Sequence, residues 1–320
     1  MSGMSADAAP ALQPGAVTAV LVCWNHAPFL RASIESVVRQ TRRAQQILVF
    51  DNGSTDGSRE LLRELEREFG ITLVFQDNVG LVRTLNRGLA MATGEFFAML
   101  ATDDMWAAEK TALQAGFLER NTDVHMVSGQ LRIVDEHGKP LDFPNEPRPG
   151  RATFAGLMTN GNCVFGPTVM CRTATLRAIG GYDESLRLED YSLALRFAHK
   201  GLGVHVLPDV LADYRRHGSN WTNRPLTNEL LEVGHRYRAC REYRDYLRYH
   251  FPQRFRSLVE TGERGAALRW LWREPIEWSW ANLGVGLIKL VLPAAITRAI
   301  KAMLGRGEVA TARPGQGPRA

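Results

Sequence analysis

The sequence predicts an α/β fold with a mostly parallel central sheet flanked by helices, followed by a C-terminal helical appendage. Through the first 120 residues, short apolar runs of strand length alternate with stretches whose apolar residues recur every three or four positions. This alternation is typical of βαβ units, in which helical crossovers join parallel strands. Hydrophobic residues at 45% and charged residues at 23% fit a globular chain and exclude one that is disordered throughout.

The elements of the first half follow one another at short intervals. Residues 1–16 are small, polar and proline-containing, and we expect a disordered leader there. Apolar strands are expected at 17–23, 47–50, 71–75 and 95–100. Helices are expected at 29–40, from the DNGSTDGS turn to residue 69, at 81–91 and at 107–118. Each helix places leucine, isoleucine, valine or alanine along one face, which can pack on the sheet.

Beyond residue 120 the pattern becomes mixed, and no internal repeat is found. Strands are expected at 124–128, 131–134, 168–171 and 204–207, with helices at 173–179 and 189–199. PNEPRPG at 144–150 predicts a loop. These elements complete one α/β domain over 17–222, with one half at 17–120 and the other at 121–222.

The C-terminal part carries the positive charge of the chain. The net charge is +5, and 14 basic but only 6 acidic residues lie between 236 and 306. We expect a helical, basic, tryptophan-rich module at 223–305 and a disordered tail at 306–320. The stretch 278–297 has the length of a membrane span, but Lys289 and Pro293 disfavour spanning. We expect it to lie in an anionic membrane interface; packing on the α/β domain is the alternative.

Several function classes are disfavoured by what the sequence lacks. Four scattered cysteines do not indicate a disulfide scaffold or a zinc site. The first sixteen residues contain no lysine or arginine, so we expect no secretory signal and a cytoplasmic location, at the inner face of the cell membrane. The loop WNHAPFL after the first strand has no glycine, which argues against a dinucleotide fingerprint. No nucleic-acid-binding motif is recognised, and no nucleic-acid partner is expected.

Polar and aromatic side chains follow three of the expected strands. Trp24-Asn25-His26 follows the first, DNGS at 51–54 the second, and Thr102-Asp103-Asp104 the fourth. Ligands of open parallel sheets bind where the carboxyl ends of the strands meet, and a carboxylate cluster there can hold a divalent cation and through it a diphosphate. Each piece alone also has a structural interpretation: a core tryptophan, a tight turn, and a solvated acidic loop.

As an ordered series these motifs resemble those of family 2 glycosyltransferases with the GT-A fold. The resemblance covers about residues 16–222. It is carried by these segments in order: VLVCWNHAPFL (20–30), SVVRQT (36–41), ILVFDNGSTDGS (47–58), DNVGLVRTLNRGLAMATGEFFAMLATDDMW (77–106), GGYDESLRLEDYSLALRFA (180–198) and DYRRHGSN (213–220).

The resemblance assigns donor binding to the first half. Trp24 would stack on the nucleotide base, and Asn25 and His26 would shape its pocket. Asp51 and Asn52 stand where the family has two acidic residues that contact base and ribose. Asparagine at the second position is a departure. Because an amide both donates and accepts hydrogen bonds, binding would survive but the identity of the nucleotide stays open.

The same resemblance implies a divalent metal, Mn²⁺ or Mg²⁺. It places Asp103 beside the ribose and the metal, and Asp104 on the metal itself. His217 is a further candidate ligand of the metal. Arg215 and Arg216 are candidates for neutralising the diphosphate.

For the second half, the resemblance makes Asp190 the general base that takes the proton of the acceptor hydroxyl. Glu189 is the neighbouring candidate, and the sequence does not separate the two. Acidic residues in the first turn of a helix also oppose its dipole, which would explain both without any catalytic role.

Taken together, the resemblance implies a metal-dependent, inverting transfer of a sugar from a nucleotide-sugar donor, with a UDP sugar expected first. The acceptor would be a hydroxyl of a glycan or lipid-linked molecule, as in surface polysaccharide assembly. Two alternatives stay open: a non-catalytic, glycosyltransferase-like binding protein, and a nucleotidyltransferase on a similar α/β fold.

Overall fold

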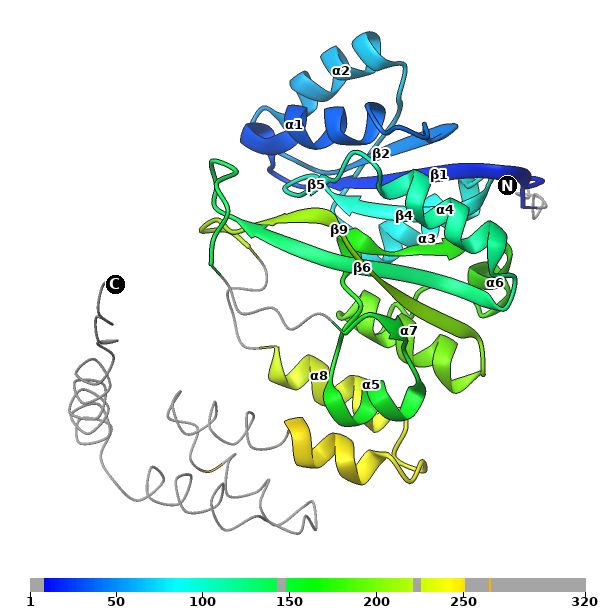
Figure 1. The fold of residues 1–320 in the computed structure, drawn as a ribbon. Coiled ribbons are helices and arrows are strands. Elements are labelled where there is room, and N and C mark those ends of the chain that lie inside the picture. The colour runs from blue at the N-terminus through cyan, green and yellow to red at the C-terminus, as the bar shows by residue number, and fades with distance from the viewer. Residues whose placement is uncertain (1–8, 143–147, 221–225, 251–264, 266–320) are drawn as a thin grey trace, which may run out of the picture. The chain divides into compact units, whose positions relative to one another are not determined.

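This computed structural model describes residues 9–142, 148–220, 226–250 and 265. In this part of the chain, nine strands form one sheet (Figure 1). The strand order is β3-β2-β1-β4-β8-β6-β9-β5, with β7 paired to β9. The strands are β1 (Gln13–Cys23), β2 (Gln46–Asn52), β3 (Thr72–Gln76), β4 (Gly94–Ala101), β5 (Met105–Trp106), β6 (Val124–Val134), β7 (Gly150–Arg151), β8 (Met170–Arg172) and β9 (Gly203–Arg215).

Helices lie on both faces of this sheet (Figure 1). They are α1 (Ala27–Val38), α2 (Ser58–Phe69), α3 (Leu81–Met91), α4 (Lys110–Arg120), α5 (Phe154–Asn160), α6 (Thr173–Ala178), α7 (Glu189–His199) and α8 (Thr227–His235). A short 3-10 turn, η1 (Gly166–Thr168), precedes β8.

The long strands share one direction. β1 pairs in parallel with β2 and β4, β2 with β3, and β6 with β9. β8 is antiparallel to both β4 and β6, so these two run the same way. The carboxyl ends of β1, β2, β4, β6 and β9 therefore meet at one edge of the sheet, where ligands of this architecture bind.

Strand β1 lies in the core and packs closely against α3. Residues 16–23 of β1 are all buried, as expected for a strand covered on both faces. A Cβ atom on Gly88 of α3 would lie only 2.7 Å from a methyl carbon of Val20, so glycine is needed for this close approach. Helix α3 is thereby seated directly on β1.

Two expected strands are longer than the sequence predicted. The two runs at 124–128 and 131–134 form one strand, β6, because Gly129 does not interrupt it. A Cβ at Gly129 would lie 2.5 Å from Leu211 Cδ1, so this glycine lets β9 approach instead. β9 continues to Arg215 through an exposed stretch at Pro208–Val210, where its register with β6 shifts.

Other boundaries moved slightly, and four short elements were not expected: β5, β7, α5 and η1. β1 begins at Gln13, within the expected leader, and α1 begins at Ala27, with Pro28 in its first turn. The two-residue strand β5 is too short to leave a periodic signal. Helix α5 is also short, and it is capped by Thr153, whose side chain accepts a hydrogen bond from Gly156 N.

The chain divides into two compact units, Met1–Arg238 and Ala239–Ala320, and α8 belongs to the first. In the second unit, the structure describes a helical stretch over 243–250 in which Tyr246 is buried. Among the described residues, no helix is long and apolar enough to cross a membrane. The expected interfacial segment 278–297, its tryptophans and the tail 306–320 lie outside the described residues.

Candidate functional site

The loop between β4 and β5 carries Thr102, Asp103 and Asp104 at the carboxyl edge of the sheet. Thr102 N donates to the carbonyl of Val22 at the end of β1, and Asp104 N donates to Ala101 O. These two backbone contacts form a tight turn next to the end of β1. The sequence prediction that the polar ends of β1 and β4 lie together is confirmed.

Asp103 lies between two imidazoles at this edge. Its Oδ2 atom is 3.2 Å from His217 Nε2 and 3.7 Å from His26 Nε2. Its Oδ1 atom is buried and has no hydrogen-bond partner in the described part of the chain. Burial alone would raise the pKa of Asp103, but the His217 hydrogen bond and the charge of His26 outweigh it, and the pKa is lowered. The carboxylate therefore stays ionised, with one oxygen uncommitted.

Both imidazoles are fixed by other contacts. His26 Nδ1 is 3.0 Å from Thr102 Oγ1, and His217 Nδ1 is 2.9 Å from Ser219 Oγ. The ring of His217 also packs on Phe29, with 4.8 Å between centroids. The sequence placed His26 only in the wall of the nucleotide pocket. The position of His26 soon after β1 predicts that it lies at the carboxyl edge of the sheet. Its proximity to Asp103 could not be predicted, because it depends on β1 and β4 being neighbours in the sheet.

Asp104 is held by β9. Its side chain is 2% exposed, and Oδ1 accepts a hydrogen bond of 2.9 Å from Arg215 N in β9. Burial, together with the charge of Asp103, raises the pKa of Asp104 well above its ordinary value. Asp104 thus anchors the acidic loop to β9, whereas Asp103 has the uncommitted oxygen.

Arg215 is directed to the protein and not toward a ligand. Its Nε donates to Asp103 O, and Nη1 donates to Glu136 O, at 2.9 and 2.8 Å. The guanidinium also stacks on Phe29, 4.9 Å from the ring centroid. In the structure the guanidinium spans the gap between the acidic loop and the residues after β6, and its role as a diphosphate ligand stays a prediction. Arg216 continues the chain after β9, with its N–H on Val134 O.

The carboxylate oxygens at this edge suit a hard divalent cation that takes its other ligands from a bound molecule. Within residues 9–142, 148–220 and 226–250, no three or more His, Cys, Asp or Glu side chains form a complete metal site. The buried, unpaired Oδ1 of Asp103, however, is an acceptor that burial disfavours unless something pairs with it. Mn²⁺ or Mg²⁺ prefers such carboxylate oxygens and commonly takes further ligands from a bound diphosphate. The residues present fit that kind of metal.

Trp24 lies beyond the end of β1 with 52% of its surface exposed, which excludes the interpretation as a core aromatic. It is held by Asn25, which adopts a positive φ of 59°. Asn25 N donates to Ser54 Oγ and Asn25 Oδ1 accepts from Thr55 N, at 2.9 and 2.8 Å. The bend at Asn25 therefore connects the end of β1 to the DNGS turn and leaves the indole available for stacking.

Asp51 and Asn52 are both almost completely buried at the end of β2. The Asp51 carboxylate accepts from Gly53 N and Ser54 N, and Oδ2 lies 3.2 Å from Arg59 Nε. These contacts are those of an Asx turn, and they commit the carboxylate to the loop.

Asn52 connects β2 to its neighbours in the same way. Its Oδ1 atom accepts from Gln76 Nε2 (2.6 Å) and from Thr84 Oγ1 (2.9 Å) on α3. The two side chains therefore shape the framework under the base site. Direct contact of either with a nucleotide stays a prediction.

The acidic pair begins α7, beside the turn η1. Asp190 Oδ2 accepts from Gly166 N at 3.0 Å, Oδ1 accepts from Tyr191 N at 2.6 Å, and Asn162 adds a side-chain hydrogen bond. A Cβ on Gly166 would lie 3.2 Å from Glu189 Oε1 and 3.5 Å from Met99 Sδ. Because Met99 lies near the end of β4, the pair stands close to the strand that leads into Asp103.

The two carboxyls of this pair influence each other. Burial, with the charge of Asp190 beside it, raises the pKa of Glu189 to about 8. Burial also raises the pKa of Asp190, despite the N–H groups of Tyr191 and Gly166 that act in the opposite direction. Near neutral pH the pair therefore tends to hold one proton, as expected for two close buried carboxyls.

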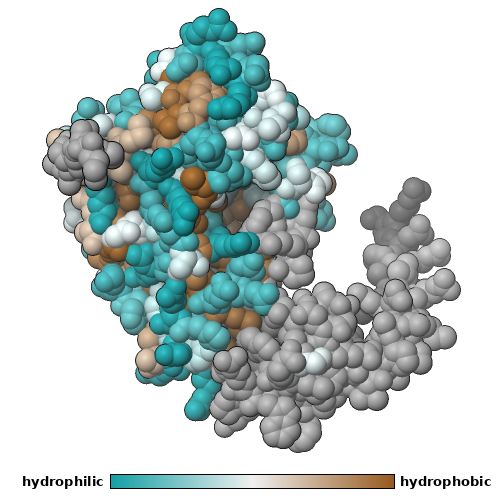
Figure 2. Space-filling view, turned by 180° about the vertical axis from the view of Figure 1, so that it is seen from behind, coloured by the Kyte–Doolittle hydropathy of each residue, from teal (hydrophilic) through white to brown (hydrophobic). Residues whose placement is uncertain are grey.

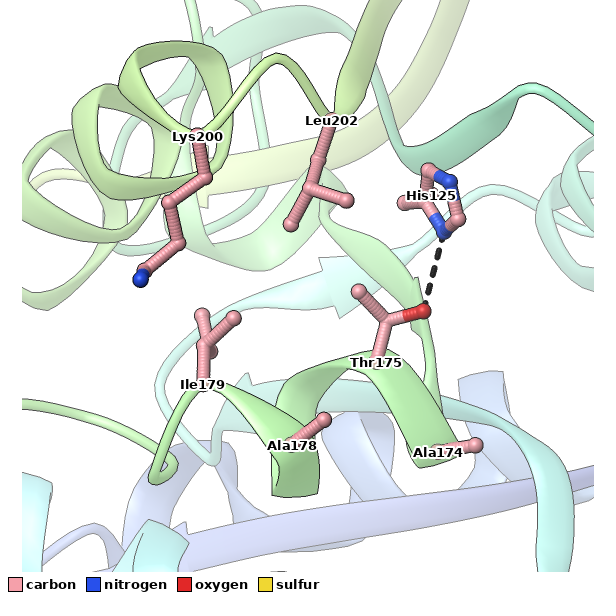
Figure 3. A pocket seen from close by; sticks show the side chains of 7 residues that line it. All are labelled: His125, Ala174, Thr175, Ala178, Ile179, Lys200 and Leu202. Carbon is pink, nitrogen blue, oxygen red and sulfur yellow. Dashed lines mark hydrogen bonds between the residues drawn. The ribbon is translucent and has the colours of Figure 1, made fainter.

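A shallow groove elsewhere on the domain belongs to the opposite edge of the sheet (Figure 3). It is lined by His125, Ala174, Thr175, Ala178, Ile179, Lys200 and Leu202. These residues come from α6 and the residue after it, from the start of β6, and from the turn between α7 and β9, at the amino ends of the strands. Figure 2 shows a mainly hydrophilic surface on the face behind that of Figure 1, interrupted by separate hydrophobic areas. Because the groove lies at the amino ends of the strands, away from the predicted site residues, we assign the site to the carboxyl edge.

Comparison with known proteins agrees with this geometry. The family model described as Glycosyl transferase family 2 matches residues 18–180. EpsE of Bacillus subtilis (strain 168) is 27% identical over 243 residues, which are 72% of this chain and 85% of EpsE.

Two solved structures share the fold. A crystal structure of S. aureus TarS 1-349 in complex with UDP-GlcNAc matches with a TM-score of 0.56 and 15% identity; the match covers 68% of this chain and 65% of that one, just under two thirds of its length. The mannosyltransferase PcManGT from Pyrobaculum calidifontis, in complex with GDP-Man and Mn²⁺, matches with a TM-score of 0.61 and 20% identity over 93% of this chain and 83% of that one. The predicted GT-A fold is confirmed.

Proposed function

This chain belongs to glycosyl transferase family 2, and from that premise we propose that it transfers a sugar from a nucleotide-sugar donor to a hydroxyl group of an acceptor with inversion at the anomeric carbon. The observation that carries the proposal is the position of Asp103. Its unpaired, buried Oδ1 stands at the carboxyl edge of the sheet, with the exposed Trp24 at the end of β1 and the acidic pair of α7 next to β4.

The donor would bind along this edge. Trp24 offers an exposed aromatic face on which a nucleotide base can stack. Asp103 would hold a divalent cation through Oδ1, and Asp104 would keep the loop attached to β9. When bound, that cation would neutralise the charge that develops on the departing diphosphate. His217 and His26 keep the Asp103 carboxylate oriented through its other oxygen. A UDP sugar is the first donor to test and a GDP sugar the second, because these are the nucleotides held by the two similar structures.

The acceptor reaction needs a base near the anomeric carbon. Asp190 or Glu189, in its ionised form, would take the proton of the acceptor hydroxyl while that oxygen attacks. The bond from the anomeric carbon to the diphosphate oxygen breaks as the new bond forms on the opposite face, which gives inversion. Asp190 is the better positioned of the two, since three hydrogen bonds fix its carboxylate in one orientation.

A transfer and hydrolysis assay tests this function. UDP- and GDP-sugars are incubated with Mn²⁺ or Mg²⁺, and release of the nucleoside diphosphate is measured for wild type, Asp103→Asn and Asp190→Asn. Asp209→Asn, in the exposed stretch of β9, is the matched control. We expect both site variants to lose at least about 100-fold in turnover and the control to match wild type. Donor binding without turnover in the wild type, with every acceptor tried, would favour a non-catalytic binding protein.

The acceptor class rests on the sequence of the C-terminal part. Its basic, tryptophan-rich composition supports a glycan or lipid-linked acceptor at an anionic membrane, as in surface polysaccharide assembly. Sedimentation of the full chain with vesicles tests this. Binding should require anionic lipid and weaken as salt is raised. Equal sedimentation with neutral vesicles would contradict it.

A further inference from the structure

We propose that Asn86 is a positioning residue for the acidic pair, holding the segment 181–188 to α3 so that Glu189 and Asp190 stay at the sheet edge; this rests on the transfer reaction proposed above. The observation is a set of three hydrogen bonds. Asn86 Oδ1 accepts from Tyr182 N at 2.8 Å, and Asn86 Nδ2 donates to Tyr182 O and to Glu184 Oε1, each at 3.0 Å. One amide side chain thus satisfies both backbone polar groups of Tyr182.

Helix α3 is a rigid support for this contact. Two residues before Asn86, Thr84 bonds Asn52 at the end of β2, and two residues after it Gly88 lies against Val20 of β1. Asn86 therefore stands between two points at which α3 is fixed to the donor half. A side chain on such an element transmits position better than one on a loop.

The segment that Asn86 holds is shaped for this contact. Gly180 and Gly181 both adopt positive φ, 85° and 68°. A Cβ on Gly181 would lie 2.5 Å from Asn86 Oδ1, so the approach requires glycine. On the other side, Arg196 of α7 donates to Gly181 O and to Ile179 O, each at 2.6 Å. The segment is thus held between α3 and α7.

Tyr182 connects the Asn86 contact to the segment that leads into the acidic pair. Its ring is buried, 6.3 Å between centroids from Phe97 of β4. Burial raises the pKa of Tyr182 well above its ordinary value, and the carboxylates of Glu189 and Asp190 act in the same direction. Fixing the Tyr182 backbone through Asn86 therefore fixes a buried residue that packs on β4 and lies in the same short stretch of chain as the candidate base.

Kinetics separate positioning from folding. In Asn86→Ala we expect kcat to fall about 10-fold or more, since a small misplacement of a catalytic group has effects of that size. Binding of UDP or GDP with Mn²⁺, measured by calorimetry, should stay within about twofold, because the Asn52–Thr84 contact remains. Asn86→Asp should behave like Asn86→Ala, because it keeps the acceptor for Tyr182 N but places an oxygen against Tyr182 O. An unchanged kcat in Asn86→Asp would overturn the proposal.

Glu184→Ala is the matched control. It removes the Asn86–Glu184 contact and the exposed ion pair of Glu184 with Arg83 (3.3 Å), and leaves both bonds to the Tyr182 backbone. We expect kcat close to wild type, since exposed ion pairs contribute little. A loss in Glu184→Ala as large as that in Asn86→Ala would show that the surface contact, and not the Tyr182 clamp, holds the segment.

Hydrogen exchange gives a readout that does not need turnover. In the full-length Asn86→Ala protein, amides of 181–190 should exchange at least about 10-fold faster, while those of β1 and β4 keep their protection. Unchanged exchange at 181–190 would refute the clamp even if the enzyme is active. Faster exchange at that segment, with a wild type that shows no transfer, would instead retain the clamp and refute the proposed reaction. Loss of protection throughout would reduce Asn86 to a folding role and reject positioning.

Discussion

His217 Nε2 lies 3.2 Å from Oδ2 of Asp103, although 114 residues separate them in the chain. This contact joins the end of β9 to the end of β4. It leaves Oδ1 of Asp103 as the oxygen that still lacks a partner, and so decides which side of the carboxylate can receive a cation.

Removing this imidazole should weaken metal use. The change His217→Ala removes the hydrogen-bond partner of Asp103 and the ring that packs on Phe29. We therefore expect the Mn²⁺ concentration for half-maximal activity to rise about 10- to 100-fold. Titration of activity with Mn²⁺ measures this. His137→Ala, at an exposed turn, is the control and should leave the curve unchanged. An unshifted curve for His217→Ala would remove His217 from the site.

The acidic pair predicts a pH-dependent reaction. Because the base must be ionised, kcat/KM should rise with pH through the range in which the pair loses its shared proton, with Glu189 at a pKa of about 8. Glu189→Gln removes the neighbouring charge, so the pKa of Asp190 should fall and the rising limb should move to lower pH. A limb that stays in place would show that Glu189 and Asp190 are not coupled.

Gly166 is expected to be needed for the placement of Glu189. In Gly166→Ala, the new methyl would lie 3.2 Å from Glu189 Oε1 and displace it by a few tenths of an ångström. We expect kcat to fall severalfold while the free energy of unfolding changes by less than about 1 kcal/mol, since the backbone itself accepts alanine. Paired kinetics and urea unfolding check this, and wild-type kcat in the variant would be the contrary result.

Lys110 should make stability depend on pH. Its side chain is fully buried, with Nζ 2.6 Å from Gln114 Oε1 and 4.3 Å from the centroid of Trp106, and burial lowers its pKa to about 7. Above pH 7 the unfolded chain binds more protons at this group than the folded chain, so its contribution to the free energy of unfolding increases with pH.

The increase from Lys110 between pH 7 and 8.5 should be about 2 kcal/mol, because one proton is worth about 1.4 kcal/mol per pH unit. Comparing the free energy of unfolding in urea of wild type and Lys110→Met over this pH range isolates the contribution of Lys110. Above that range the Cys171 thiol, whose pKa burial raises well above its ordinary value, works in the opposite direction because it stays protonated only when folded. Parallel pH curves for the two proteins would disprove the assignment to Lys110.

The sequence predicted the alternating elements of the first half closely because their signals are local. The apolar run at 17–23 and the helical faces of 58–69 and 81–91 reappear as the cores of β1, α2 and α3. β5 was missed because a two-residue strand has no period. β9 was predicted too short because Pro208 and Asp209 are poor strand formers locally, yet pairing with β6 carries the strand across them.

For the site, the sequence by itself determined which residues follow the strands: Trp24, Asp103 and Asp104 in the first half, and the pair Glu189–Asp190 at a helix start. These follow from hydrophobic patterning and from motifs that chemistry restricts to few residue types. Which of them have uncommitted atoms was decided only by the tertiary structure. Hydrogen-bond partners distant in sequence commit the Asp104 carboxylate to the backbone of Arg215 and the Arg215 guanidinium to the backbone of Asp103, yet leave Asp103 Oδ1 unpaired. The charge of Asp190 next to Glu189 could be seen in the sequence, but the burial that raises the pKa of Glu189 most strongly arises only when separate segments meet in space.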